Sequence, residues 1–501
     1  MAPRTKRGLP AKKSMGRSQK SRRLAKFQTV QHHGEAAPTT SEAEDSTQPS
    51  PSARRRKAGP SRLETLPAEL RILVLSHIDD LNDLRAVVHA SPILHQQYCL
   101  DKQRFLVQAL RGTLLGTLLG DAFAVWASDM YFTSRKEHEP PVVDQGITTL
   151  LGDYNVLRSD PDAVLAQCGL EHLVSMASFY MGVAQPLLFE VPRRMNDILR
   201  KMKRGPKLGA LTETERTRFL RALYRFQVFQ NLFGAYLEPA SRFTDIRILT
   251  DFFGAFQPWE IEEIGCINKL VGNTYNEFRA RIASKDDKYH PVTGERIKLP
   301  TWTPRDISER QAIRKSLPVL DFIFLHPPFY HAKQKLISVR PPGHRSNDAD
   351  NNKRQLLLDG TVARGLVQFQ RVLRTSNREE QAALAQKTVD TYVGEPINDC
   401  LRWATQYRRR SGQRSEDDRR EDDREPLFFS GDKEDGPPAA WTTIWGNTFS
   451  NTYGDIIPSS MQNWGYVFWD EERLLQSRGI WALEKACKEL WQGHDPRGPD
   501  F

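Results

Sequence analysis

The stretch LETLPAELRILVLSHIDDLNDLRAVVHASPILHQQYCLDKQRFL, residues 63–106, decides how the rest of the chain is interpreted. Leu66-Pro67 predicts the start of a helix, because proline is tolerated in a first helical turn, where its missing N–H had no partner to lose. Thr65 is placed to cap this helix. Glu69 stands in the first turn, where the helix dipole favours negative charge.

Two more capping signals divide the stretch into three short helices. Asp79-Asp80 interrupts the first helix and can cap a second, and Ser91-Pro92 supplies a cap and a first-turn proline for a third. Apolar residues continue at helical spacing in both: Leu84, Val87 and Val88 in the second, and Ile93, Leu94, Tyr98, Phe105 and Leu106 in the third.

The first helix is apolar almost all round, which indicates burial on two sides. One side carries Leu70, Leu73, Val74 and Ile78, and the other carries Ile72 and Leu75. A three-helix unit of about 45 residues is near the lower size limit for a core of its own, so it covers one face only. The second face must meet either the rest of this chain or another protein, and the pattern alone leaves both open.

The Leu-Pro pair, the apolar residues after it and the later Ser-Pro run resemble an F-box of the variant common in filamentous fungi. F-boxes are three-helix modules that bind the Skp-family adaptor of cullin–RING ubiquitin ligases. A tryptophan found in the third helix of many F-boxes is absent here, and Tyr98 stands in that region. The resemblance implies that the adaptor contacts Leu66, Pro67, Leu70, Ile72, Leu75 and Ile78, and also Leu84 and Val88.

The composition predicts an intracellular protein. The five cysteines are scattered and form no zinc-type spacing, which indicates a reducing compartment and free buried thiols. The most apolar run, Leu114–Ser128, contains Asp121 and is too short to span a bilayer. The N-terminus carries charge but has no apolar signal region. We therefore expect a nuclear and/or cytoplasmic location.

The basic character of the chain belongs to its first 60 residues. They carry 14 Lys/Arg and 4 Asp/Glu, a net charge of +10, and the other 441 residues sum to zero. Few large apolar residues occur there, so we expect a disordered tail. The clusters Arg4–Lys26 and Arg54–Lys57 are typical of a split nuclear localisation signal that binds an import receptor. They also suit non-specific contact with nucleic acid or a solubilising role, while the lack of stacking aromatics argues against specific nucleic-acid recognition.

The rest of the chain predicts a mainly α fold with an irregular multi-helix body. Thr212–Glu215 fits a capping box for the best-formed helix, which Gly234 can end, and Gln257-Pro258-Trp259 marks a break and a restart. Residues 135–160 are expected to form a loop. Glycines 112, 116 and 120 share one helical face and predict close helix packing. The predicted division is a tail at 1–60, an F-box-like domain at 61–110, a body at 111–407, a charged linker at 408–438, and a C-terminal segment at 439–501.

The C-terminal segment holds six of the ten tryptophans. This concentration predicts a segment that docks on the body, or else an aromatic surface that holds a partner. The piece GYVFWDEERL within it, and the helices around Gln257-Pro258-Trp259, also resemble the helical body that follows the F-box in fungal proteins.

No motif for catalysis, phosphate binding or zinc binding occurs, so we expect no enzyme activity and no cofactor. Three glutamates are expected mainly on the solvent-exposed side of a helix, where their pKa values stay ordinary: Glu260, Glu262 and Glu263. His326 and His331 flank a double proline and do not share a helical face, which argues against a metal site.

The resemblance to an F-box implies a substrate-recruiting adaptor of a ubiquitin ligase, with the substrate held by the body. One alternative is a helical scaffold whose F-box-like unit is buried against its own body. Exposure of Ile72 and Leu75 in the free protein would distinguish the two. The other alternative is a nuclear protein that associates with nucleic acid through its tail.

Overall fold

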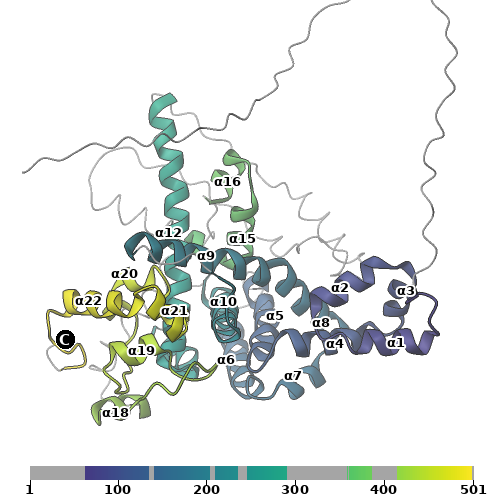
Figure 1. Ribbon diagram of the computed structural model, residues 1–501, viewed down its shortest axis with the longest axis horizontal. Coiled ribbons are helices and arrows are strands. Elements are labelled where there is room, and N and C mark those ends of the chain that lie inside the picture. The colour runs from purple at the N-terminus through teal and green to yellow at the C-terminus, as the bar shows by residue number, and fades with distance from the viewer. Residues whose placement is uncertain are drawn as a thin grey trace, which may run out of the picture. The chain divides into compact units, whose positions relative to one another are not determined.

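The structure is a computed structural model and is mainly helical (Figure 1). The chain divides into two units, Met1–Gly59 and Pro60–Phe501. All of the residues that the structure describes belong to the second unit, and no strand occurs among them: they are 62–134, 140–203, 209–234, 245–289, 358, 360–385 and 415–498. The predicted basic tail, His326 and His331 lie outside the described residues.

Four helices occupy the stretch that opened the sequence analysis and its continuation. They are α1 (Ala68–Ser76), α2 (Leu81–Ala90), α3 (Pro92–Leu100) and α4 (Lys102–Thr113). The third predicted helix is therefore shorter than expected, and Phe105 and Leu106 belong to α4, where both are buried.

Local capping signals account for the starts of α2 and α3 and not for those of α1 and α4. The Asp80 carboxylate accepts the backbone N–H of Asn82, and the Ser91 hydroxyl accepts that of Leu94, as predicted. The predicted cap at Thr65 is wrong, because the Thr65 hydroxyl donates to the Arg62 carbonyl and the N-cap position of α1 is occupied by Pro67. A proline has no side-chain acceptor, so α1 begins without a side-chain cap.

The helices that follow are packed around a long buried pair. α5 and α10 make the most extensive helix contact among the described residues, and α10 also packs against α12. The bounds are α5 (Leu118–Ser134), α6 (Pro140–Leu157), α7 (Pro161–Gln167), α8 (Leu170–Phe179), the π-helix η1 (Tyr180–Ala184), α9 (Gln185–Lys203), α10 (Glu213–Phe233), α11 (Asp245–Asp251), the 3₁₀ turn η2 (Phe253–Ala255), α12 (Pro258–Tyr289), α15 (Gly365–Arg374) and α16 (Arg378–Ala385).

Two signals predicted the central helices correctly. The Thr212 hydroxyl accepts the N–H of Glu215, and the Glu215 carboxylate accepts the N–H of Thr212, so the capping box opens α10. α12 starts at Pro258, as the break before it indicated. The loop expected at 135–160 is wrong: α6 fills most of that range, because Pro140 and Pro141 stand in its first turn, where prolines are tolerated.

The three glycines near the α4–α5 junction have different roles. Gly116 adopts a left-handed φ of 56° in the turn that separates the two helices, so the three do not line one continuous helix. Gly112 and Gly120 allow close packing, as predicted. A Cβ on Gly112 would overlap the Asp79 carbonyl oxygen, and one on Gly120 would lie 2.7 Å from the Arg158 Cα.

Replacing Gly112 by alanine is expected to destabilise the protein by about 1–3 kcal/mol, because the new methyl group collides with backbone at the α1–α2 turn. Urea unfolding followed by circular dichroism measures this. Gly152→Ala is the control, because Gly152 is exposed on α6 and a methyl group added there would meet nothing within 4 Å. Alanine there is expected to raise stability by up to about 1 kcal/mol. Equal effects of the two changes would contradict the close packing of α4 against the α1–α2 turn.

The charged stretch predicted as a linker is, in its described part, a folded element. α18 (Glu416–Asp422) begins with the Ser415 hydroxyl as cap, and the segment after it carries an isolated bridge between Pro426 and Thr448. Glu421 is buried and accepts hydrogen bonds from the Ser450 hydroxyl at 2.8 Å and the Thr452 hydroxyl at 3.0 Å. Residues 415–438 therefore include a capped helix that holds a buried, hydrogen-bonded acid, in addition to exposed charged residues.

The Trp-rich segment packs against α10 and α12. Its helices are α19 (Ala439–Ile444), η3 (Gly454–Ile456), α20 (Ser459–Gln462), η4 (Tyr466–Phe468), α21 (Glu471–Gln476) and α22 (Gly479–Trp491). Five of the six tryptophans are buried and Trp481 is exposed. The ring of Phe468 stacks on that of Phe219 in α10, with centroids 4.0 Å apart. These contacts agree with docking of the segment on the helices before it.

Candidate partner-binding surface and buried charge network

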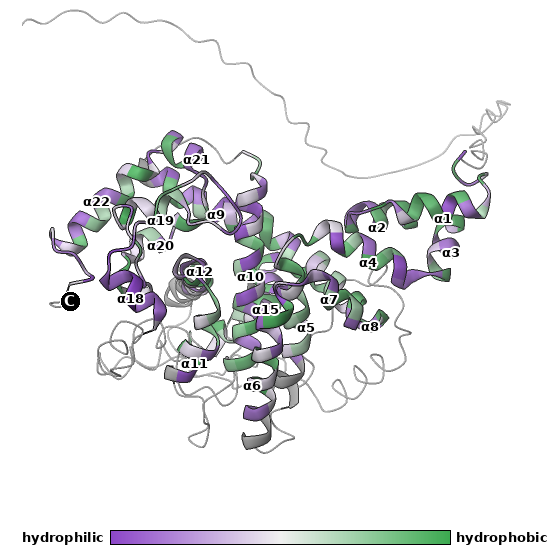
Figure 2. Ribbon diagram, turned by 90° about the horizontal axis from the view of Figure 1, so that it is seen from below, coloured by the Kyte–Doolittle hydropathy of each residue, from purple (hydrophilic) through white to green (hydrophobic). Residues whose placement is uncertain are grey.

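α1 presents part of its apolar surface to solvent. Leu70 is 46% exposed and Leu73 is 51% exposed, and the two stand three residues apart on the helix. Figure 2 shows hydrophobic residues along α1. Side chains three apart in a helix lie on the same side, so Leu70 and Leu73 form one apolar patch.

The eight residues predicted to contact an adaptor divide into surface and core. Pro67 and Leu70 are exposed. Leu66, Ile72 and Ile78 are half-buried, and the last two pack against the core. Leu75, Leu84 and Val88 are fully buried, so a partner cannot reach them in this structure.

The prediction omitted two exposed leucines that belong to the same helical unit. Leu73 was placed on the correct side of the first helix but was not selected as a contact residue. Leu100, at the end of α3, is 77% exposed. Leu100 directly precedes Asp101, at which α3 ends, so no further turn of α3 packs over its side chain. This position is the sequence feature that could have predicted its exposure.

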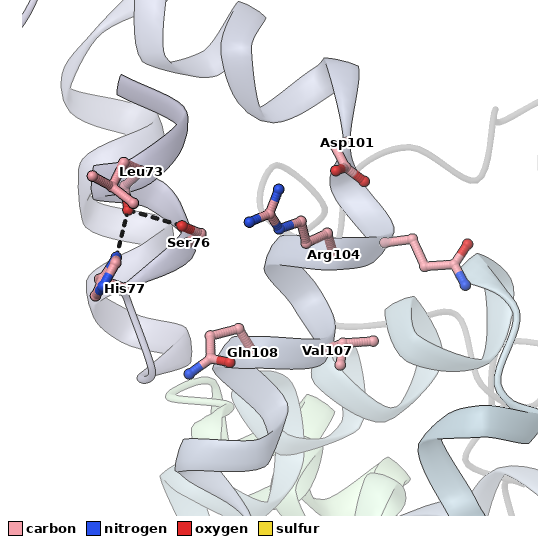
Figure 3. Close-up of a pocket in the computed structure, with 8 residues that line it drawn as sticks. Leu73, Ser76, His77, Asp101, Arg104, Val107 and Gln108 are labelled. Carbon is pink, nitrogen blue, oxygen red and sulfur yellow. Dashed lines mark hydrogen bonds between the residues drawn. The ribbon is translucent and has the colours of Figure 1, made fainter. Parts of the chain in front are cut away.

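A groove of about 650 Å³ lies between α1 and α4 (Figure 3). The guanidinium of Arg104 extends from α4 toward Ser76 across it, and a His77 ring nitrogen is hydrogen-bonded to the Leu73 carbonyl at 2.8 Å. The lining is polar except for Leu73 and Val107, and it comprises Leu73, Ser76, His77, Asp101, Gln103, Arg104, Val107 and Gln108. The groove therefore continues the leucine patch as a mixed polar and apolar surface.

Contacts with later helices hold this unit in place. The Leu81 backbone N–H donates to the Thr113 hydroxyl at 3.0 Å, so α2 starts on the end of α4. The Asn82 side-chain carbonyl accepts from the Gln185 amide of α9 at 2.8 Å. α4 in turn packs against α8. The patch on α1 is thus carried by a unit that is joined to the rest of the fold by buried and half-buried polar contacts.

A second unusual feature is a set of buried ion pairs on α10. Arg218, Arg221 and Arg225 fall on one face of the helix and are almost completely buried. Glu260, Glu262 and Glu263 of α12 are buried as well. The prediction that these glutamates lie on the wet side is wrong, because α10 covers one side of α12 and the C-terminal segment covers another.

Distances show that the charges are closely paired. Arg221 lies 2.5 Å from Glu263 and 3.1 Å from Glu260, and Arg225 lies 3.0 Å from Glu260. Burial would raise the pKa of Glu260, but Arg225 and Arg221 overcome that effect and hold it at about 2. For Glu263, burial outweighs the attraction of Arg221 and raises the pKa above its ordinary value.

Glu262 has a different environment from its two neighbours. Its carboxylate accepts the Gly454 N–H at 2.5 Å, the Gln462 amide at 3.2 Å and the Tyr466 hydroxyl at 3.3 Å. All three donors come from the C-terminal segment. This carboxylate therefore fixes the loop between α19 and α20 on α12.

The network is a set of closed ion pairs and hydrogen bonds, and the grooved surface on α1 and α4 is the better candidate for binding. Within the described ranges, no group of three or more His, Cys, Asp or Glu side chains is arranged to hold a metal ion. None of the helices in the described ranges is both long and apolar enough to cross a membrane. Comparison with family models, curated proteins and solved structures found no match to the chain.

Proposed function

We propose that the protein recruits a substrate to a cullin–RING ubiquitin ligase, with residues 63–106 binding a Skp-family adaptor and the helical body binding a protein substrate. The proposal rests on the resemblance of the motif to an F-box. The observation that supports it best is the exposed pair Leu70 and Leu73, because two neighbouring leucines half open to solvent on a short helix are typical of a protein contact.

The proposed mechanism is proximity. The chain performs no bond chemistry itself in this proposal. It raises the effective concentration of substrate lysines beside the charged ubiquitin-conjugating enzyme, which accelerates transfer without a new catalytic group. The contacts of the unit with α8 and α9 support this role, since they limit the freedom with which a bound adaptor could move relative to the body.

We propose adaptor contacts at the accessible residues of the predicted set, which are Leu66, Pro67, Leu70, Ile72 and Ile78, together with Leu73. Leu75, Leu84 and Val88 hold the unit together from inside and support the contact surface indirectly. We also propose that the basic tail directs the protein to the nucleus through an import receptor. The two basic clusters on either side of a stretch without lysine or arginine support that location.

A second candidate function is a helical interaction scaffold with no ligase role. The burial of Leu75 favours it, because exposure of this residue and of Ile72 was the feature expected of an F-box free to bind. The ligase function predicts that the exposed leucines are needed for adaptor binding, and the scaffold function predicts that they are not.

The test is co-purification of the full-length chain with a fungal Skp-family adaptor. Replacing Leu70 and Leu73 together by aspartate is expected to weaken binding by at least about 30-fold, because two central apolar contacts are lost and two charges would be buried. Both side chains are exposed, so helical circular dichroism is expected to stay unchanged. The Leu66→Ala/Pro67→Ala pair and Ile72→Asp are expected to act in the same direction.

The matched control replaces Leu475 and Leu490, two exposed leucines of α21 and α22, by aspartate. This change is expected to leave adaptor binding intact. If the wild-type chain forms no complex, or if both double variants bind equally well, the scaffold function replaces the ligase function.

A further inference from the structure

The helix α3 carries the one exposed thiol among the cysteines that the structure describes. Cys99 is open to solvent, whereas Cys168, Cys266 and Cys487 are buried. The prediction of buried thiols is therefore wrong for Cys99. Burial raises the pKa of the Cys168 thiol to about 11 and that of the Cys487 thiol to about 12, so both keep their protons at neutral pH. Of these four thiols, the Cys99 thiol is the one that an ion from solvent can reach.

A histidine lies beside this thiol on the same face of α3. His95 stands four residues before Cys99, and its Nε2 atom lies 3.6 Å from the Cys99 Sγ atom. Side chains four residues apart on a helix are neighbours. The same spacing joins the two histidines that hold zinc on a helix in the HExxH motif. His95 is half-buried, so the helix holds the ring next to the thiol without removing it from solvent.

The separation of the two atoms equals that of two ligands of one zinc ion. Zinc binds cysteine sulfur at about 2.3 Å and histidine nitrogen at about 2.0–2.1 Å in tetrahedral geometry, which places the two ligand atoms about 3.5–3.6 Å apart. The observed 3.6 Å also suits a hydrogen bond between the thiol and the ring. In both cases the sulfur and the nitrogen face each other, and a metal ion would take the place of the proton between them.

The chemistry of the two side chains favours zinc over magnesium or calcium. Thiolate and imidazole ligands suit zinc, whereas magnesium and calcium take oxygen ligands. When the ion binds, the proton of the Cys99 thiol passes to solvent, and the neutral His95 ring supplies an electron pair from Nε2. Two protein ligands are fewer than the four of a structural zinc site, so water fills the remaining positions and the ion exchanges with solvent.

We propose that His95 and Cys99 form an exchangeable zinc-binding site on the exposed side of α3. The ion joins two consecutive turns of the helix, so its binding is expected to stabilise the folded protein. The site needs no residue from another chain. It lies in the helical unit that carries the leucine patch, but it is independent of the function proposed above.

Cobalt titration of the full-length protein tests the site, in a buffer that contains a thiol-free reductant. Co²⁺ replaces zinc in such sites, and its bond to a thiolate gives a near-ultraviolet charge-transfer absorption that nitrogen and oxygen ligands do not give. We expect this absorption in the wild type, and we expect Zn²⁺ to remove it by competition. The affinity for cobalt is expected to rise with pH, because the ion displaces the proton of the thiol.

Replacing each ligand separates metal binding from a plain hydrogen bond. Cys99→Ser is expected to abolish the thiolate absorption. His95→Gln is expected to weaken cobalt binding by at least about tenfold, because even the loss of a residue that only supports a ligand costs that much. Helical circular dichroism is expected to stay unchanged in both variants, since neither side chain is buried in the core.

His89→Gln is the matched control. His89 is an exposed histidine of α2 in the same helical unit, and Ile93 rather than a cysteine stands four residues after it. This variant is expected to bind cobalt as the wild type does. The site is ruled out if the wild type shows no thiolate absorption, if Cys99→Ser keeps it, or if His95→Gln binds cobalt as tightly as the wild type.

Discussion

Replacing Arg221 by methionine is expected to lower the free energy of unfolding by about 3–5 kcal/mol, because the change leaves Glu263 buried without its main counter-charge. The Arg221 guanidinium is 2.5 Å from Glu263 and also donates to the Glu434 carbonyl at 2.6 Å, so one substitution removes contacts with both α12 and the segment after α18. A domain of ordinary stability has only about 5–15 kcal/mol in total. Chemical denaturation followed by circular dichroism measures the loss.

Arg193→Met is the matched control for this experiment. Arg193 forms ion pairs with Glu190 and Asp197 on α9, but its side chain is more than half exposed. Exposed pairs contribute little, so the expected loss is below about 1 kcal/mol.

The double variant Arg221→Met/Glu263→Leu is expected to recover much of the stability, because neither charge is then left buried alone. An Arg221→Met protein as stable as Arg193→Met would contradict the buried network. The same conclusion would follow if the double variant lost the sum of the two single effects.

Replacing Trp469 by alanine is expected to cost about 3–5 kcal/mol, the range for removing a large aromatic side chain from a core. Trp469 is completely buried, its indole N–H donates to the Trp464 carbonyl at 2.9 Å, and its ring meets that of Phe219 edge-on at 5.3 Å. The cavity would open between α10 and the C-terminal segment. Denaturation curves and near-ultraviolet circular dichroism report the loss.

Trp481→Ala is the comparison, because Trp481 is half exposed and contacts the Lys485 side chain on the outside of α22. Its expected effect is below about 1 kcal/mol, as for most surface substitutions. If both substitutions lower the free energy of unfolding by an equally small amount, the C-terminal segment is not an integral part of the fold. The prediction of an aromatic surface that holds a partner would then be the better one.

These two predictions test different contacts between α10 and the elements packed around it. Arg221 joins α10 to α12 and to the segment after α18 by charge, and Trp469 joins α10 to the C-terminal segment by packing. Glu262 adds a third contact, a hydrogen bond between α12 and the segment before α20.

Local signals allowed the sequence to predict the helices most accurately. The caps at Asp80, Ser91 and Thr212, and the restart at Pro258, depend on side chains within a few residues of the helix that they begin. The same reasoning failed at Pro140-Pro141, since a proline pair can either break a chain or open a helix and no local signal distinguished the two.

The sequence pattern could not predict which charged residues are buried. Each helix, taken alone, places its charged residues where solvent would be expected, and for Glu260, Glu262 and Glu263 this expectation was wrong. The spacing of Arg218, Arg221 and Arg225 places all three on one face of α10. Two of them pair with acids on α12. The spacing could have predicted buried ion pairs only if the packing of α10 against α12 had been known. The burial of Leu75 and the exposure of Leu70 were likewise undecided, since the first helix is apolar on every side.

The sequence by itself therefore determined the mainly helical class and the starts of several helices, because these depend on periodic hydrophobicity and on local capping. The tertiary structure decided which face of α1 remains open, that residues 415–438 are folded, and that the charges of α10 and α12 neutralise each other inside the protein. Those outcomes depend on contacts between residues distant in the chain. The free energy of a buried charge or an exposed leucine is fixed by its neighbours in space rather than by its neighbours in sequence.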